Sequence, residues 1–213
     1  SSSRQIAGEL RKTWRSSPTL GRRAPSDAIV LFDGTSTGHL TKGQMTADGL
    51  LIEGAEFDTP CRDFTMHLEY RLPFMPHARG QGRANSGVYI SSRYEVQILD
   101  SFGLRGEDNE CAALYRLRRP DVNMCFPPLS WQTYDIDFTA ARYNDSGEKT
   151  QNARITVKHN GVAIHDNFEL PHLTPGGAPN EAPKLRTTRA FNERARRYRR
   201  STSTSPAHAS ASW

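Results

Sequence analysis

Residues 64–72 read Phe64-Thr65-Met66-His67-Leu68-Glu69-Tyr70-Arg71-Leu72, with an apolar side chain at every second position. Successive side chains of a β-strand point to opposite faces, so this pattern predicts a strand with one buried and one polar face. The same alternation recurs in residues 94–98, 134–138 and 154–158. Asn160-Gly161 follows the last of these, and Asn-Gly supplies the two positive-φ residues of a tight hairpin turn.

The segment 24–183 contains no stretch with a helical period, and loops rich in Pro and Gly separate the expected strands. Many short strands joined by turn residues are typical of β-sandwiches and jelly rolls. We therefore predict an all-β jelly-roll sandwich.

Length and composition limit the class of protein. The chain has 213 residues, 36% apolar and 24% charged, which suits one domain with its own core or at most two small ones. It contains no run of some 18 apolar residues, so we expect no membrane span. Three Cys residues are too few for a disulfide scaffold. The chain begins at Ser1 without an apolar segment, so we expect an export signal to be absent or already removed.

The positive charge belongs to the two ends of the chain. Residues 1–23 hold six basic and one acidic residue, and residues 184–213 hold eight and one, whereas the segment between them has a net charge of −7. We therefore expect a tail or linker over 1–26, a folded domain over 27–183, and a disordered or poorly packed basic tail over 184–213. A nucleic-acid partner is not expected, because the predicted folded body is acidic.

Alternation also places polar side chains on defined faces. His67, Glu69 and Arg71 share the polar face of one strand, and Glu95 and Gln97 share that of another. A row of carboxylates and amides across a concave sheet is suited to sugar hydroxyls. The alternative is that these are the ordinary solvent-facing residues of an antiparallel sheet.

Glycosidases usually need two carboxylates, one to protonate the leaving oxygen and one to act as base or nucleophile. Here Gln97 stands where a second carboxylate would follow Glu95 on the same strand. Glu69 and Glu95, from different strands, remain as a candidate pair.

Other catalytic and metal motifs are absent: the chain has no phosphate-binding Gly-rich loop before a helix, no HExxH and no GxSxG. For Cys111 and Cys125 we favour buried free thiols over one disulfide, and either over a nucleophile. The acidic loop 106–110 lacks the ligand spacing of a known Ca²⁺ loop and is interpreted as a solvated turn. We therefore expect no cofactor, with a divalent metal such as Ca²⁺ left open.

Seven segments together resemble the 3-keto-disaccharide hydrolase domain family over roughly residues 27–180. They are Ala28-Ile-Val-Leu-Phe-Asp-Gly34, Asn85-Ser-Gly-Val-Tyr-Ile90, Tyr94-Glu-Val-Gln-Ile-Leu-Asp-Ser101, Ala113-Leu-Tyr115, Pro120-Asp-Val-Asn123, Trp131-Gln-Thr-Tyr-Asp-Ile136 and the stretch from Ala153 to Val162. The resemblance implies a concanavalin A-like jelly roll, a periplasmic or extracellular location, and action on sugars oxidised at carbon 3.

The resemblance also implies a chemistry that needs no carboxylate pair. A ketone at carbon 3 acidifies the proton on carbon 2, a base removes that proton, and the substituent on carbon 1 then leaves. From the face geometry we assign Glu95 as the acid/base or sugar-binding carboxylate, Glu69 as the alternative base and Arg71 as the enolate stabiliser. Asn85 and Gln97 would bind hydroxyls.

His67 and Tyr115 complete the set of expected substrate-binding residues. His67 shares the polar face of Glu69, and Tyr115 ends one of the segments that carry the resemblance.

The resemblance ends after Pro183, where family members continue with a closing strand and a polar histidine. We expect the loss of that strand to leave a sheet edge open. This departure favours an alternative function, a non-catalytic carbohydrate-binding module on the same sandwich. A second alternative is a basic-tailed protein bound to nucleic acid or to an acidic surface.

Overall fold

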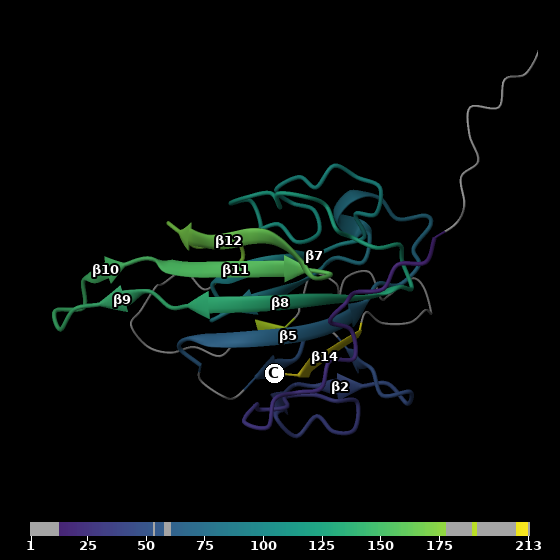
Figure 1. The fold of residues 1–213 in the computed structure, drawn as a ribbon, viewed down its shortest axis with the longest axis horizontal. Helices are drawn as coiled ribbons and strands as arrows, with labels where there is room; N and C mark the ends of the chain where they lie inside the picture. Colours follow the sequence, from purple (N-terminus) through teal and green to yellow (C-terminus); the bar gives the residue numbers. More distant parts are fainter. Residues whose placement is uncertain (1–12, 53, 58–60, 178–188, 191–207, 213) are drawn as a thin grey trace, which may run out of the picture.

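The computed structural model describes residues 13–52, 54–57, 61–177, 189–190 and 208–212. Two five-stranded antiparallel sheets dominate it (Figure 1). Sheet A has the order β12 (Val162–Leu170), β11 (Ala153–His159), β8 (Trp131–Thr139), β5 (Phe64–Arg71) and β14 (His208–Ser212). Sheet B has the order β1 (Leu40–Thr41), β4 (Glu56–Phe57), β13 (Arg189–Ala190), β6 (Ser86–Ile90) and β7 (Tyr94–Ile98).

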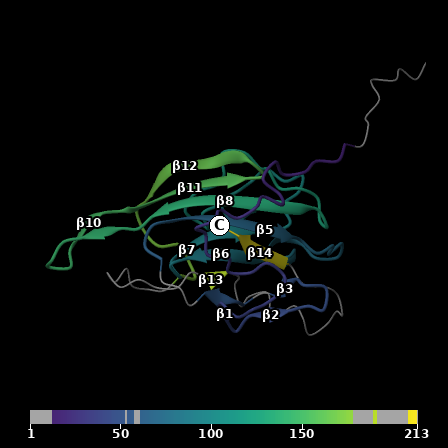
Figure 2. The ribbon, with the colours of Figure 1, turned by 60° about the horizontal axis from the view of Figure 1, so that its bottom comes forward.

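Shorter elements complete the described fold. Strands β2 (Gln44–Met45) and β3 (Leu51–Ile52) pair with each other, as do β9 (Arg142–Tyr143) and β10 (Lys149–Gln151). The β9–β10 pair forms an arm that projects from the body (Figure 2). The one helical element among the described residues is a 3₁₀ turn, η1 (Gly80–Gly82). The prediction of an all-β sandwich is therefore confirmed.

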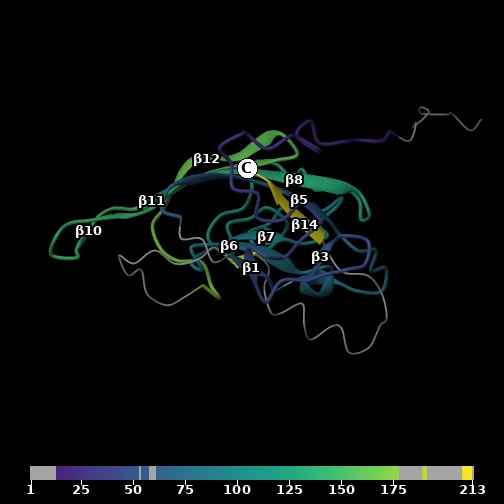
Figure 3. The same ribbon diagram turned by 90° about the horizontal axis from the view of Figure 1, so that it is seen from below.

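The two sheets form two layers with the core between them (Figure 3). Strand β5 contributes Met66, Leu68 and Tyr70 to this core, and the ring of Tyr94 in β7 lies 5.9 Å from the ring of Phe138 in β8. Alternate residues of β5 and β8 are thus buried against sheet B, as the sequence pattern of these strands predicts. The hairpin at Asn160-Gly161 is also confirmed, since these residues have φ values of 50° and 80° between β11 and β12.

A buried polar cluster joins the two layers. The hydroxyl of Tyr134 in β8 donates a hydrogen bond of 2.7 Å to the carbonyl oxygen of Gln97 in β7, and it lies 3.3 Å from the Cys111 Sγ. Cys111 and Cys125 are buried thiols that form no disulfide, as expected. In the part of the chain that the structure describes, no helix is long and apolar enough to cross a membrane.

Part of the expected N-terminal tail lies against sheet A. We call residues 17–22 the strap. The Ser17 hydroxyl lies 2.6 Å from that of Thr133, the Thr19 hydroxyl donates to Asp135 Oδ2 at 2.8 Å, and Arg22 Nη2 lies 3.0 Å from Asp135 Oδ1. Residues 17–22 are therefore a packed part of the domain rather than a linker, while residues 1–12 lie outside the described residues.

The C-terminal segment contributes two strands. Strand β13 lies between β4 and β6 in sheet B, and β14 pairs with β5 in sheet A. The expectation that sheets lose a closing strand after Pro183 is therefore wrong for these two positions, because the atypical sequence still supplies backbone partners there. The remainder of the expected basic tail, residues 184–188, 191–207 and 213, lies outside the described residues.

Candidate active site

Glu95 and Gln97 lie on the face of sheet B that points away from sheet A. Their neighbours in β7, Tyr94, Val96 and Ile98, point into the core, so alternation turns Glu95 and Gln97 outward. Both side chains are nonetheless buried, at 2% and 1% exposure. Loops therefore cover this face of the sheet and make it a second polar interior.

The Glu95 carboxylate is held against strand β6. A Cβ atom placed on Gly87 would lie 2.4 Å from Glu95 Oε1, so only glycine leaves room for the carboxylate in this position. Tyr89, directly opposite Glu95 in the β6–β7 ladder, donates a hydrogen bond of 2.6 Å to Glu95 Oε2. The Glu95 backbone N–H donates to Thr174 Oγ1 at 2.8 Å. The close approach to Gly87 and the Tyr89 hydrogen bond fix the orientation of the carboxylate, and the Thr174 bond holds its backbone.

Tyr115 lies on the other side of Glu95. Its backbone N–H donates to the Glu95 carbonyl at 3.0 Å, and the adjacent Leu114 pairs with Val96 and is buried in the core. Alternation therefore puts Tyr115 on the same face as Glu95. The Arg116 guanidinium lies 5.8 Å from the Tyr115 ring centroid, within cation–π range.

Three side-chain amides form a second group beside Glu95. Gln81 Oε1 accepts hydrogen bonds from Asn85 Nδ2 at 3.2 Å and from Gln97 Nε2 at 3.1 Å. Gln81 Nε2 donates to the Asn109 carbonyl at 2.6 Å. We call the set Gln81, Asn85, Tyr89, Glu95, Gln97 and Tyr115 the Glu95 site.

The structure brings four of the seven sequence-predicted residues together: Asn85, Glu95, Gln97 and Tyr115. Sequence reasoning missed Tyr89 and Gln81. Tyr89 could have been found, because alternation over residues 86–90 puts it on the face of its cross-strand partner Glu95. Gln81 lies in a loop turn, where no periodicity applies.

The other three predicted residues, His67, Glu69 and Arg71, lie on the outer face of sheet A. Their neighbours in β5 are buried against sheet B, so these side chains point away from it. The suggested pairing of Glu69 with Glu95 is therefore wrong, because the core separates the two carboxylates. Arg71 likewise does not reach Glu95; its guanidinium lies 5.4 Å from the ring centroid of Trp131 on its own sheet.

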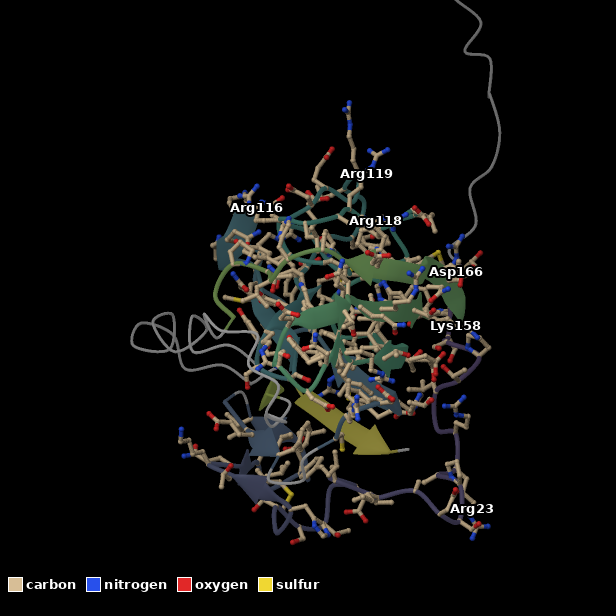
Figure 4. The ribbon with its side chains drawn as sticks, turned by 90° about the vertical axis from the view of Figure 1, so that its left-hand side faces the viewer. Arg23, Arg116, Arg118, Arg119, Lys158 and Asp166 are labelled. Atoms are coloured by element: carbon tan, nitrogen blue, oxygen red, sulfur yellow. The ribbon has the colours of Figure 1, made fainter. Side chains whose placement is uncertain are left out.

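Charged side chains lie on both sides of the sandwich, over the outer face of sheet A and on the side of the Glu95 site (Figure 4). Lys158 is the cross-strand partner of Asp135 and lies, with Arg23, on the side of sheet A, whereas Arg116 lies on the side of the Glu95 site. A substrate at one face therefore does not contact the side chains of the other.

His67 is the centre of a charged cluster under the strap. Its Nδ1 lies 2.8 Å from Asp135 Oδ1 and its Nε2 lies 3.2 Å from Glu69 Oε1. Burial alone lowers the pKa of His67, but the hydrogen bonds to both carboxylates outweigh it and raise the pKa to about 8. Because the Gly21 backbone N–H of the strap also donates to Glu69, this cluster already has partners from the chain itself.

No metal centre is evident in the described part of the chain, where no group of three or more His, Cys, Asp or Glu side chains could hold an ion. In the acidic loop, Glu110 Oε2 accepts the backbone N–H groups of Gly106 at 2.7 Å and Glu107 at 2.9 Å. The Glu110 carboxylate therefore stabilises the loop itself through backbone hydrogen bonds. That the protein works without a cofactor stays a prediction.

Residues 27–189 match the family described as the 3-keto-alpha-glucoside-1,2-lyase-like domain. The chain belongs to this family. The strap precedes the matched segment, whereas all six residues of the Glu95 site lie within it.

Three crystal structures from Parabacteroides distasonis, each described as a "putative glycosyl hydrolase", are similar in fold. One has a TM-score of 0.70 at 25% identity, covering 88% of this chain and 81% of its own. The others have TM-scores of 0.51 and 0.52 at 13% and 16% identity, covering 86% and 87% of this chain and 88% and 95% of theirs. At that identity they show the fold alone. No protein of curated function matches the chain.

Proposed function

We propose that this chain cleaves the glycosidic bond of 3-keto-glycosides at the Glu95 site. The observation on which the proposal rests is the buried Glu95 carboxylate, which accepts a hydrogen bond of 2.6 Å from Tyr89 and shares its face of sheet B with a group of three side-chain amides and Tyr115. Such a set combines one base with hydroxyl-binding groups. Membership of a family described by 3-keto-α-glucoside lyase chemistry supports the choice of substrate.

The reaction needs one base and one group that stabilises negative charge. The ketone at carbon 3 acidifies the proton on carbon 2, and Glu95 accepts that proton. The electron pair of the C–H bond moves into an enolate, and the substituent on carbon 1 then leaves with the electrons of its bond. Addition of water to the resulting double bond would make the net reaction a hydrolysis.

The Tyr89 hydroxyl is suited to stabilise the enolate. It donates to the Glu95 carboxylate before reaction, and that carboxylate loses its charge when it takes up the proton. The hydroxyl can then donate to the developing oxyanion, where a fixed donor lowers the barrier. Tyr89 thus takes the role that sequence reasoning gave to Arg71.

The test is release of a chromogenic leaving group from a 3-keto-glucoside. We expect Glu95→Gln to lower kcat by at least about 100-fold, the usual contribution of a general base, while sugar binding by calorimetry is kept. The matched control is Glu69→Gln on the opposite face, which should keep kcat within about two-fold. Full activity in Glu95→Gln would refute the assignment.

A carbohydrate-binding module is the second candidate. The amides of Asn85 and Gln97, both hydrogen-bonded to Gln81, and the Tyr115 ring are groups that can bind sugars without any chemical reaction. Sugar binding by the wild type without release of the leaving group would favour this function. The family resemblance also favours a periplasmic or extracellular location, which fractionation of the source cells tests.

A further inference from the structure

Gln81 makes three hydrogen bonds inside the Glu95 site and has no role in the proposed chemistry. It lies in η1, in a loop that follows Pro73 and Pro76, and its amide is the point where three segments meet. Its Nε2 donates to the Asn109 carbonyl, and its Oε1 accepts from Asn85 and from Gln97.

The Asn109 carbonyl determines the orientation of all three amides. A backbone carbonyl only accepts hydrogen bonds, so the Gln81 side chain must turn its NH₂ group toward Asn109 and its oxygen toward the other two amides. That oxygen has two lone pairs and meets two NH₂ groups, one from Asn85 and one from Gln97. Reversing any of the three amides would bring two oxygens or two NH₂ groups together, so only this set of orientations satisfies all the hydrogen bonds.

The consequence for Asn85 differs from that for Gln97. Gln97 Oε1 accepts the backbone N–H of Ile98 at 3.2 Å, so both ends of that amide are held within the protein. Asn85 is half-buried, and because its NH₂ group faces Gln81, its Oδ1 faces the other way. The amide of Asn85 therefore presents its Oδ1 acceptor on the side away from Gln81, where a ligand hydroxyl could donate to it.

We propose that Gln81 is a positioning residue that makes the Glu95 site select sugars carrying a hydroxyl donor opposite Asn85 Oδ1. The inference rests on the proposed function for the identity of the ligand. Through Gln81, the carbonyl of Asn109 fixes which way the Asn85 amide is turned, although Asn109 and Asn85 share no hydrogen bond. A bound sugar lacking that hydroxyl would displace water from Asn85 Oδ1 without giving it a new partner, which is unfavourable.

The test compares a 3-keto-glucoside with its 4-deoxy-4-fluoro and 6-deoxy-6-fluoro analogues, in which fluorine replaces a hydroxyl donor. In the wild type we expect one analogue to raise KM about 10-fold or more, as loss of a hydroxyl from a site built to bind it does. We call the ratio of KM for that analogue to KM for the parent sugar the analogue penalty. In Gln81→Leu, KM for the parent sugar should rise about 10-fold while kcat stays within about three-fold. The analogue penalty should fall to about two-fold.

Gln81→Glu is the matched variant, because its carboxylate still accepts from Asn85 and Gln97 but cannot donate to Asn109. It should keep most of the analogue penalty. Thermal unfolding of each variant shows whether it is folded. An unchanged penalty in folded Gln81→Leu would overturn the inference, since a merely structural role raises KM for parent and analogue equally.

The two proposals fail in different ways. A wild type that acts on the parent sugar without discriminating against either analogue overturns the role of Gln81 and leaves the proposed function intact. A wild type that releases no leaving group refutes the proposed function, and the same comparison made on Kd by calorimetry then decides the role of Gln81.

Discussion

At the scale of single residues, His67 makes stability depend on pH. Its pKa is about 8 in the folded chain, above the value of 6.5 for an unperturbed histidine, because Asp135 and Glu69 both hydrogen-bond the ring. A raised pKa means that the folded state binds the proton more tightly. The stabilisation is therefore fully present below pH 6.5 and is lost as the pH rises through 8.

We expect that loss to be about 2 kcal/mol, because the pKa of His67 rises from 6.5 to about 8 on folding. Urea unfolding at pH 6 and pH 9 measures it, and His67→Gln is the reference, since its amide keeps hydrogen-bonding capacity without titrating. The wild type should lose about 2 kcal/mol more than His67→Gln over this range. The same change with pH in both proteins would contradict the role of the histidine.

At the scale of elements, alternation predicts strands well but does not assign them to sheets. It correctly predicts the strands that became β5, β7, β8 and β11, and Asn160-Gly161 predicts the β11–β12 hairpin. It does not predict that Glu69 and Glu95 belong to strands of opposite sheets, because the alternation over residues 64–72 and over 94–98 indicates only that one face of each strand is buried. The two-residue strands of sheet B are too short for any period to show.

The strap is an element that composition conceals, because its Ser, Thr, Pro and Arg residues resemble those of a linker. Its position depends on polar contacts that only the folded sheet provides. Thr19→Val removes the hydroxyl that donates to Asp135 at 2.8 Å and lies 2.9 Å from the Thr133 hydroxyl. We expect unfolding free energy to fall by about 1 to 2 kcal/mol, since a hydrogen bond to a charged acceptor is lost.

Ser16→Ala is the control for the strap. Ser16 precedes it, is exposed, and makes a 3.5 Å contact with the Ser17 carbonyl, so urea unfolding should change by less than about 0.5 kcal/mol. Equal losses from Thr19→Val and Ser16→Ala would show that the strap contributes nothing specific.

At the scale of the whole molecule, the Glu95 site is assembled from segments that only the complete sandwich brings together. Strands β6 and β7, the turn at η1 and the segment 112–115 each contribute side chains. Sequence reasoning predicts Glu95 and Gln97 on β7 but misses Tyr89 on β6, and the loop residue Gln81 depends on a contact to Asn109 that no local pattern encodes.

Sheet A supports this site from behind through Tyr134. Its hydroxyl crosses the core to the carbonyl of Gln97, so Tyr134→Phe should remove about 1 kcal/mol of stability and also lower kcat/KM, because β7 loses a fixed contact behind Glu95 and Gln97. Tyr70→Phe is the matched control: the Tyr70 hydroxyl lies 3.0 Å from His159 Nε2 in β11 and 3.5 Å from Cys111 Sγ, both outside β7. It should lower stability similarly and leave kcat/KM unchanged. Urea unfolding measures the loss of stability, and kcat/KM per folded molecule measures the loss of activity. An equal loss of kcat/KM in both variants would mean that the site responds to overall stability rather than to the hydrogen bond between Tyr134 and Gln97.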